Sequence, residues 1–216
     1  MDLEAARTAM IDSQVRPNDV TDRRLIAAMA AVPREAFVPE ARRGLAYSEA
    51  SVETGPGRAL APARDFSKLV HAAAIRDTDR LLDVAPGAGY SSVVLVHLAG
   101  SVVALEQDEA SAKILKDNLA AQGASGVEVV AGPLKAGAAA KGPFDVIFVN
   151  GAIEDVPDAW LGQLAEGGRL VVAVNEGLVR RARVYTRSGG KTAWRTPFES
   201  SSPILPGFEK AASFQL

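Results

Sequence analysis

Residues 80–90 of this 216-residue chain read Arg-Leu-Leu-Asp-Val-Ala-Pro-Gly-Ala-Gly-Tyr. The first six residues form a short, mostly apolar run that is typical of a buried strand, and the helical pattern of 89–98 follows after a brief turn. Glycines at the end of such a strand let the backbone approach a ligand closely, because they carry no Cβ. The stretch therefore predicts a strand, a ligand-binding turn and a helix.

Downstream of this stretch, strand-like runs alternate with helical segments. Strands are expected at 101–105, 127–130, 144–149 and 169–174, and helices at 108–121 and 157–164. Such alternation implies parallel strands joined by crossover helices, and near-continuous apolar strands fit burial on both faces. The sequence thus predicts a doubly wound, mostly parallel α/β sheet.

Both ends of the chain depart from the alternation. Helices are expected at 5–15, 22–31 and 63–75, with a long irregular segment rich in proline and glycine before the last of them. Beyond residue 177, strands at 178–186 and 193–198 flank Ser188-Gly189-Gly190, which predicts an antiparallel hairpin. We expect one domain over 1–216, composed of a helical amino-terminal extension with a substrate-side loop (1–62), an α/β core that binds the cofactor (63–176) and antiparallel edge strands (177–216).

Composition and charge exclude several functional classes. The chain has 24 basic and 26 acidic residues and no long run of one sign, so nothing predicts a surface for nucleic acid or an acidic membrane. It has no cysteine and only two histidines, which excludes thiolate zinc sites and argues against any metal centre. The amino terminus has no signal-peptide pattern, and the most apolar stretch is too short for a bilayer. We therefore expect a cytoplasmic protein without a membrane or nucleic-acid partner.

The glycine spacing in the turn distinguishes between nucleotide cofactors. It does not match the dinucleotide pattern Gly-x-Gly-x-x-Gly. It matches an acidic residue followed by x-Gly-x-Gly-x-Gly, the first-strand signature of S-adenosylmethionine (SAM) methyltransferases, with Asp83 as the acid and Ala85 in place of the first glycine. The next strand ends at Glu106, 17 residues after Gly89, where a carboxylate suits a ribose diol. The turn fits simple helix packing as well, and Glu106 equally fits a place beside the next helix start.

Longer motifs carry a resemblance to a known family. Residues 10–16 read Met-Ile-Asp-Ser-Gln-Val-Arg, and residues 29–39 are very close to the segment M-x-x-V-P-R-x-x-F-V-P. With 82–90, 144–149 and 167–171, they make nearly the whole chain resemble the protein-L-isoaspartate O-methyltransferase family. The resemblance implies that SAM donates a methyl group to the carboxylate of an isoaspartyl or D-aspartyl residue in a damaged protein, leaving S-adenosylhomocysteine. The methyl ester then collapses to a succinimide, which allows repair.

The resemblance and the turn together define an expected cofactor site without a metal. The expected cofactor-binding residues are Asp83, Ala85, Gly87, Gly89, Tyr90, Glu106, Gln107, Gly132 and Asn150.

Three segments that face the ligands in this family differ here. Residues 57–63 read Gly-Arg-Ala-Leu-Ala-Pro-Ala where the family has Gly-Gln-Thr-Ile-Ser-Gln-Pro, so Ala59 and Ala61 lack the hydroxyls. Residues 132–134 read Gly-Pro-Leu instead of Gly-Asp-Gly, and 150–152 read Asn-Gly-Ala instead of Thr-Ala-Ala. The ligand-facing segments have therefore changed while the scaffold has not.

Methyl transfer to a carboxylate needs no general base, because that acid is already ionised at pH 7. Catalysis would depend on positioning, alignment and exclusion of water. Arg58 is our candidate catalytic residue, since a guanidinium can hold the acceptor carboxylate bidentately in place of the missing hydroxyls. Arg58 fits equally well as a solvated loop residue or as a partner of the carboxylate of SAM.

Two other functions remain open. The chain fits a catalytically degenerate methyltransferase fold, with or without SAM, that serves regulation or protein interaction. It also fits a methyltransferase for a different carboxylate substrate, for which residues 47–63 would shape another pocket.

Overall fold

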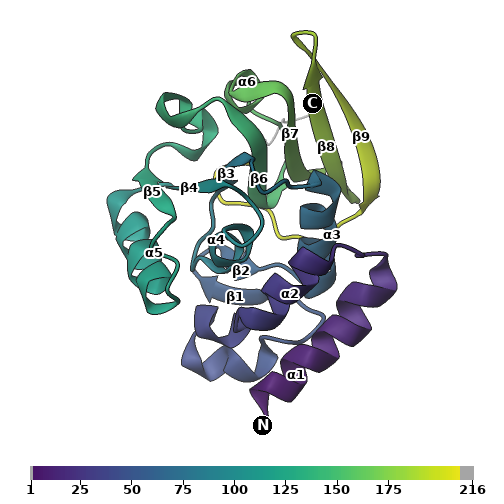
Figure 1. Cartoon of the computed structure of the whole chain (residues 1–216), viewed down its shortest axis with the longest axis vertical. Helices are drawn as coiled ribbons and strands as arrows, with labels where there is room; N and C mark the ends of the chain where they lie inside the picture. Colours follow the sequence, from purple (N-terminus) through teal and green to yellow (C-terminus); the bar gives the residue numbers. More distant parts are fainter. Residues whose placement is uncertain (1, 210–216) are drawn as a thin grey trace, which may run out of the picture.

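The computed structural model describes residues 2–209 and contains a seven-stranded sheet with the strand order β5-β4-β3-β6-β7-β8-β9 (Figure 1). Five strands are parallel: β3 (Arg80–Val84), β4 (Ser101–Glu106), β5 (Glu128–Ala131), β6 (Phe144–Ile153) and β7 (Leu164–Asn175). The last two, β8 (Arg180–Ser188) and β9 (Lys191–Glu199), are antiparallel to their neighbours. The prediction of a mostly parallel α/β sheet that ends in antiparallel strands is therefore confirmed.

The strand order places the turn after β3 at the centre of the sheet. The chain passes from β3 to β4 and β5 on one side, then returns to β6 on the other side of β3. Ligands of open α/β sheets bind beyond the carboxyl ends of the strands where the order reverses in this way. The turn quoted first from the sequence thus lies at the expected ligand crevice.

The two faces of the sheet are covered differently. Val146 and Phe148 of β6 belong to one apolar cluster, whereas Ile147 and Val149 belong to another, because side chains alternate along a strand. The first cluster packs under five helices: α1 (Leu3–Met10), α2 (Arg23–Ala31), α3 (Ala63–Ala73), α4 (Tyr90–Leu95) and α5 (Glu109–Ala121). The second lies under the 3₁₀ turns η5 (Leu134–Ala136) and η6 (Ala139–Lys141), the short helix α6 (Asp158–Gly162) and the segment 200–208.

The first apolar cluster includes residues from each of the three segments expected from the sequence, among them Met10, Phe148 and Val184. A shared core is what makes a chain fold as one unit. We therefore propose that the chain is a single domain. Within the described residues, no helix is both apolar and long enough to span a bilayer.

Three aspartates fix where helices begin. Asp2, Asp22 and Asp108 accept hydrogen bonds from backbone N–H groups in the first turns of α1, α2 and α5, at 2.7 to 3.0 Å. Each bond satisfies a donor that has no partner inside the helix. These caps explain why the predicted starts of α2 and α5 lie within one residue of the observed ones.

Several predicted boundaries differ from the structure. The helix expected at 5–15 is α-helical only to Met10 and continues as a π-helical turn, Ile11–Val15, and a 3₁₀ turn, Arg16–Asn18. Pro17 lies within the 3₁₀ turn, where its missing N–H interrupts the helical ladder, and the left-handed Asp19 (φ +61°) ends the helical stretch. The helix expected at 157–164 is only the five-residue α6, because Leu164 already pairs with β6 as part of β7.

The irregular segment contains ordered elements that the sequence analysis missed. It holds the 3₁₀ turns η3 (Arg34–Phe37) and η4 (Glu40–Leu45) and a hairpin of two short strands, β1 (Val52–Gly55) and β2 (Arg58–Leu60). The side chain of Arg34 is buried and donates to the carbonyl oxygens of Ala46 (2.9 Å) and Ala61 (2.8 Å). Arg34 thereby ties both ends of the segment together.

The segment 200–208, called the strap below, crosses the carboxyl end of β6. The N–H of Ala152 donates to Pro203 O (2.7 Å), and the N–H of Leu205 donates to Ala152 O (2.8 Å). Gly151 lies directly beneath, with φ +146°, and a Cβ at this position would stand 2.6 Å from Leu205 Cγ. The strap can approach β6 this closely only because residue 151 is glycine.

We predict that Gly151→Ala lowers the free energy of unfolding by about 2–3 kcal/mol, since it adds both backbone strain and a steric clash with Leu205. Gly123→Ala is the matched control, because Gly123 has φ +70° with nothing within 4 Å of an added Cβ. The control should lose only about 1 kcal/mol from strain. Urea unfolding measures both, and equal losses would show that the strap does not depend on Gly151.

Candidate functional site

The turn after β3 keeps the backbone that its glycine spacing predicts. Ala85, Gly87 and Gly89 have φ values of +59°, +60° and +102°, in or near the left-handed region that favours glycine. Ala85 adopts this conformation despite its Cβ, at a cost of about 1–2 kcal/mol, and its N–H donates to Leu105 O at 2.9 Å. At Gly89 a Cβ would stand 2.8 Å from Leu115 Cδ1 of α5. Ala85 thus adopts the left-handed conformation that a glycine at this position would adopt without strain.

Asp83 lies beneath this turn rather than in an open cavity. Its side chain is completely buried and accepts hydrogen bonds from Ser91 Oγ (2.8 Å), Ser92 Oγ (2.6 Å) and Asn150 Nδ2. Burial raises the pKa of Asp83 to about 7, although the three hydrogen bonds that it accepts pull the pKa down. Asp83 thus connects β3, α4 and β6 at the point where the site is built.

Glu106 closes the other side of the turn. Its buried carboxylate accepts the N–H of Gly87 at Oε1 (2.7 Å), while Oε2 accepts from Arg58 Nη2 (3.0 Å) and from the N–H of Gln107 (3.2 Å). The side chain of Glu106 is 1% exposed and that of Arg58 is 14% exposed, so this ion pair is largely withdrawn from water. Both carboxylate oxygens are therefore in use.

A cavity of about 310 Å³ opens beside Glu106. It is bounded by the β1–β2 hairpin, the turn after β3, the end of β4, the first half of α5 and the strap; the residues in its wall are Thr54, Gly55, Pro56, Arg58, Gly87, Ala88, Glu106, Gln107, Ser111, Ile114 and Pro206. Its size is within the range of small-molecule sites. The Glu106 carboxylate and the exposed apolar side chain of Ile114 fit a nucleoside, because a carboxylate can bind ribose hydroxyls and an apolar side chain can contact a base.

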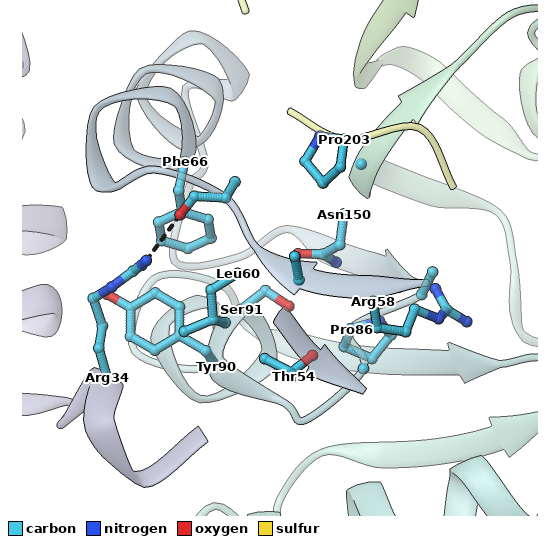
Figure 2. A pocket seen from close by; sticks show the side chains of 15 residues that line it. Arg34, Thr54, Arg58, Leu60, Phe66, Pro86, Tyr90, Ser91, Asn150 and Pro203 are labelled. Atoms are coloured by element: carbon cyan, nitrogen blue, oxygen red, sulfur yellow. Dashed lines mark hydrogen bonds between the residues drawn. The ribbon is translucent and has the colours of Figure 1, made fainter. Parts of the chain in front are cut away.

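A second, smaller cavity of about 40 Å³ lies behind the hairpin, with room for a water molecule or two (Figure 2). Arg34 and Arg58 lie at opposite ends of it, and Ala59, Ala61 and Asn150 are part of its wall. Ala59 and Ala61 therefore stand where hydroxyls would face this cavity.

Three buried polar atoms in the wall of the small cavity have no hydrogen-bond partner among the described residues: Arg34 Nη1, Arg58 Nη1 and Tyr90 Oη. The Tyr90 ring is held 4.8 Å from the Arg34 guanidinium carbon and packs against Phe37 and Phe66. Burial raises the pKa of Tyr90, so its hydroxyl stays protonated at neutral pH. Unsatisfied buried donors are costly, so an acceptor such as a carboxylate oxygen within reach of Arg34 or Arg58 would be favoured.

The predicted site residues fall into three groups. Glu106 and Gln107 border the large cavity, Ala85, Tyr90 and Asn150 border the small one, and Gly87 and Arg58 border both. Asp83, Gly89 and Gly132 border neither. The N–H of Gly132 donates to the carbonyl oxygen of Glu106 (2.8 Å), so this residue supports the end of β4.

Sequence reasoning missed Thr54, Ser111, Ile114 and Pro206. The sequence carried no signal for Ile114, which fits the apolar stripe of its helix and is found to be 59% exposed only in the structure. Residues 2–209 contain no cluster of three or more histidine or acidic side chains that could hold a metal ion.

Comparisons with known proteins identify the family of the chain. The family model of protein-L-isoaspartate(D-aspartate) O-methyltransferase matches residues 5–200. A protein-L-isoaspartate O-methyltransferase from Roseiflexus is 37% identical over 87% of this chain and 84% of its own length. One from Methanoculleus marisnigri is 34% identical over 78% of this chain and 76% of its own.

Solved structures show the same fold at lower identity. A protein-L-isoaspartate O-methyltransferase superposes with a TM-score of 0.81 at 22% identity, covering 93% of this chain, which spans 66% of that protein. A Plasmodium falciparum protein described as a protein-L-isoaspartate O-methyltransferase, solved in complex with S-adenosyl-L-homocysteine, gives a TM-score of 0.77 at 16% identity, covering 92% of this chain and 97% of its own. From the family model and the sequence relatives, with the fold in agreement, the chain belongs to the protein-L-isoaspartate O-methyltransferase family.

Proposed function

We propose that this protein transfers a methyl group from SAM to the carboxylate of isoaspartyl or D-aspartyl residues in damaged proteins. The observation that carries the proposal is the preserved turn of residues 85–89 beside a ligand-sized cavity with the Glu106 carboxylate in its wall. Family membership and the names of the sequence relatives support the same activity.

The residues around the large cavity fit the cofactor. Glu106 would hold the ribose hydroxyls, Gln107 and Ser111 offer further polar contacts, and Ile114 offers an apolar wall for a base. The cofactor, when bound, supplies a methyl group on a positively charged sulfur. Gly87 gives the ligand close access to the backbone, because its Cβ position is open except for Thr54 and Arg58 at 4.0 Å.

The small cavity fits the acceptor. A carboxylate is ionised at pH 7, so the protein has no proton to remove and needs only to hold and desolvate the oxygen. Arg34 and Arg58 make the surroundings of the cavity positive, and their unpaired Nη1 groups are donors for such an oxygen. The substrate-side loop within residues 1–62 contributes both arginines. The cytoplasmic location and the lack of a nucleic-acid partner stay predictions.

Two observations favour a second candidate, a degenerate methyltransferase fold that does not transfer the methyl group. Ala59 and Ala61 border the small cavity without the family's hydroxyls, and Arg58 is held by Glu106 instead of facing an open acceptor site. The same two facts fit a methyltransferase whose acceptor is a different carboxylate.

We expect S-adenosylhomocysteine to bind with micromolar affinity in a calorimetric titration. With labelled SAM, an isoaspartyl peptide should gain a base-labile methyl ester, and the matched peptide with normal aspartate should not. Binding without ester formation would favour the degenerate fold or another carboxylate substrate. Labelling of both peptides alike would contradict specificity for isoaspartate.

Asp83 should give the protein a distinct dependence of stability on pH. Its pKa is about 7 when folded and near 4 when unfolded, so between these values the folded state keeps a proton that the unfolded state loses. The contribution of Asp83 to the free energy of unfolding therefore falls as the pH rises from about 4 to 7. Asp83→Asn should not show this fall. Between pH 4 and 7, the free energy of unfolding of wild type should therefore decrease relative to that of the variant by about 1 kcal/mol per pH unit. Urea unfolding at several pH values measures both.

Asp108→Asn serves as the control for this pH dependence. Asp108 is exposed, and hydrogen bonds from Ser111 lower its pKa, so its stabilising effect is lost as the pH falls. The control should therefore leave the slope between pH 4 and 7 unchanged and alter the pH dependence only below about pH 4, in the opposite direction. A slope left unchanged by Asp83→Asn would mean that Asp83 is ionised in the folded protein throughout this range.

A further inference from the structure

Arg58 occupies the position that a ribose diol would need. Glu106 has two oxygens: Oε1 is bound to the N–H of Gly87, and Oε2 is bound to Arg58 Nη2 at 3.0 Å and to the backbone N–H of Gln107 at 3.2 Å. A diol binds a carboxylate through both oxygens, so it has to compete with these donors. Gly87 is fixed in the turn, whereas Arg58 is a long side chain on a two-strand hairpin. The side chain that can give way is therefore Arg58.

The competition between Arg58 and the ribose hydroxyls is strong because Glu106 is buried. A carboxylate that is 1% exposed is strongly destabilised if it loses a partner without gaining another. Arg58 can leave only when other donors replace it, and the ribose hydroxyls are suitable donors. Cofactor binding and the release of Arg58 are thus expected to occur together.

The position of Arg58 determines where a released guanidinium can go. Only Thr54, Arg58 and Gly87 belong to the walls of both cavities, and Arg58 is the charged one of the three. Its Nη1 is already buried without a partner. In the part of the chain that the structure describes, the small cavity next to it contains no carboxylate in its wall that could pair with the guanidinium in place of Glu106, although Thr54, Ser91 and Asn150 offer neutral oxygens.

We propose that Arg58 links the two binding events: Glu106 holds it in the cofactor-free protein, the ribose releases it, and it then binds the acceptor carboxylate. The cofactor therefore binds before the acceptor, and each raises the affinity for the other. This inference rests on the proposed function, which supplies the cofactor and the acceptor. It assigns Arg58 to the acceptor and not to the carboxylate of the cofactor.

Arg58→Ala separates these assignments. Because the variant removes the competitor for Glu106, it should bind S-adenosylhomocysteine about 5- to 10-fold more tightly than wild type in calorimetry. In wild type, saturating S-adenosylhomocysteine should raise the affinity for an isoaspartyl peptide at least 10-fold, and in Arg58→Ala this increase should vanish. Weaker cofactor binding by Arg58→Ala would overturn the proposal, since it would place Arg58 on the cofactor.

Two further variants complete the test: a second substitution at Arg58 and a control at an exposed arginine. Arg58→Gln keeps an N–H donor for Glu106 without the charge, so it protects folding if the alanine variant is unstable, and it should also bind S-adenosylhomocysteine more tightly than wild type. Arg16→Ala removes the same charge from an exposed side chain that pairs with Asp12 and borders neither cavity. It should behave as wild type in both titrations.

The outcomes also separate this inference from the proposed function. If neither wild type nor the Arg58 variants bind S-adenosylhomocysteine, both proposals are refuted. Binding that is identical in wild type and the Arg58 variants refutes only the role of Arg58. Binding by the Arg58 variants but not by wild type would show that Arg58 blocks the cofactor, and it would contradict both the release of Arg58 by the ribose and the proposed function of the wild-type protein.

Discussion

The buried carboxylate of Asp83 is the constraint on which the site depends. A carboxyl group at the end of a central strand is costly to bury, and the protein satisfies it with two serines from α4 and one asparagine from β6. These bonds fix the start of α4 and the end of β6 relative to β3. The turn between β3 and α4 then has little freedom, which explains how Ala85 can be held at a positive φ.

The two cavities beside this buried carboxylate share the β1–β2 hairpin as a wall. The β1–β2 hairpin separates the large cavity from the small one, and Arg58 on that hairpin is paired with Glu106. The hairpin has only two short strands, so its place depends on contacts at its ends, such as the hydrogen bond from Arg34 to Ala61. The protein thus combines a base held by several buried hydrogen bonds with a wall held by few contacts, an arrangement suited to the release of Arg58 that we propose.

The sheet could be predicted from the sequence because parallel strands buried on both faces leave long apolar runs, of which Val146 to Val149 is an example. The turn could be predicted because its backbone requires glycine at fixed spacing. The hairpin could not, since strands of four and three residues carry too little pattern. The pairing of Arg58 with Glu106 was also beyond reach, because it joins residues 48 positions apart through tertiary structure alone. Ile114 and Pro206 were missed for the same reason.

The strap has a consequence for how the protein is made. Pro206 forms part of the large cavity, and it lies against Gly57, where an added Cβ would stand 2.4 Å from Pro206 Cγ. During synthesis on a ribosome, the helices, the turn and the hairpin therefore emerge well before the last piece of the cavity wall. A chain still short of residue 206 has most of its core but an incomplete ligand site. Ligand binding can then stabilise the finished protein but cannot guide the early steps of its folding.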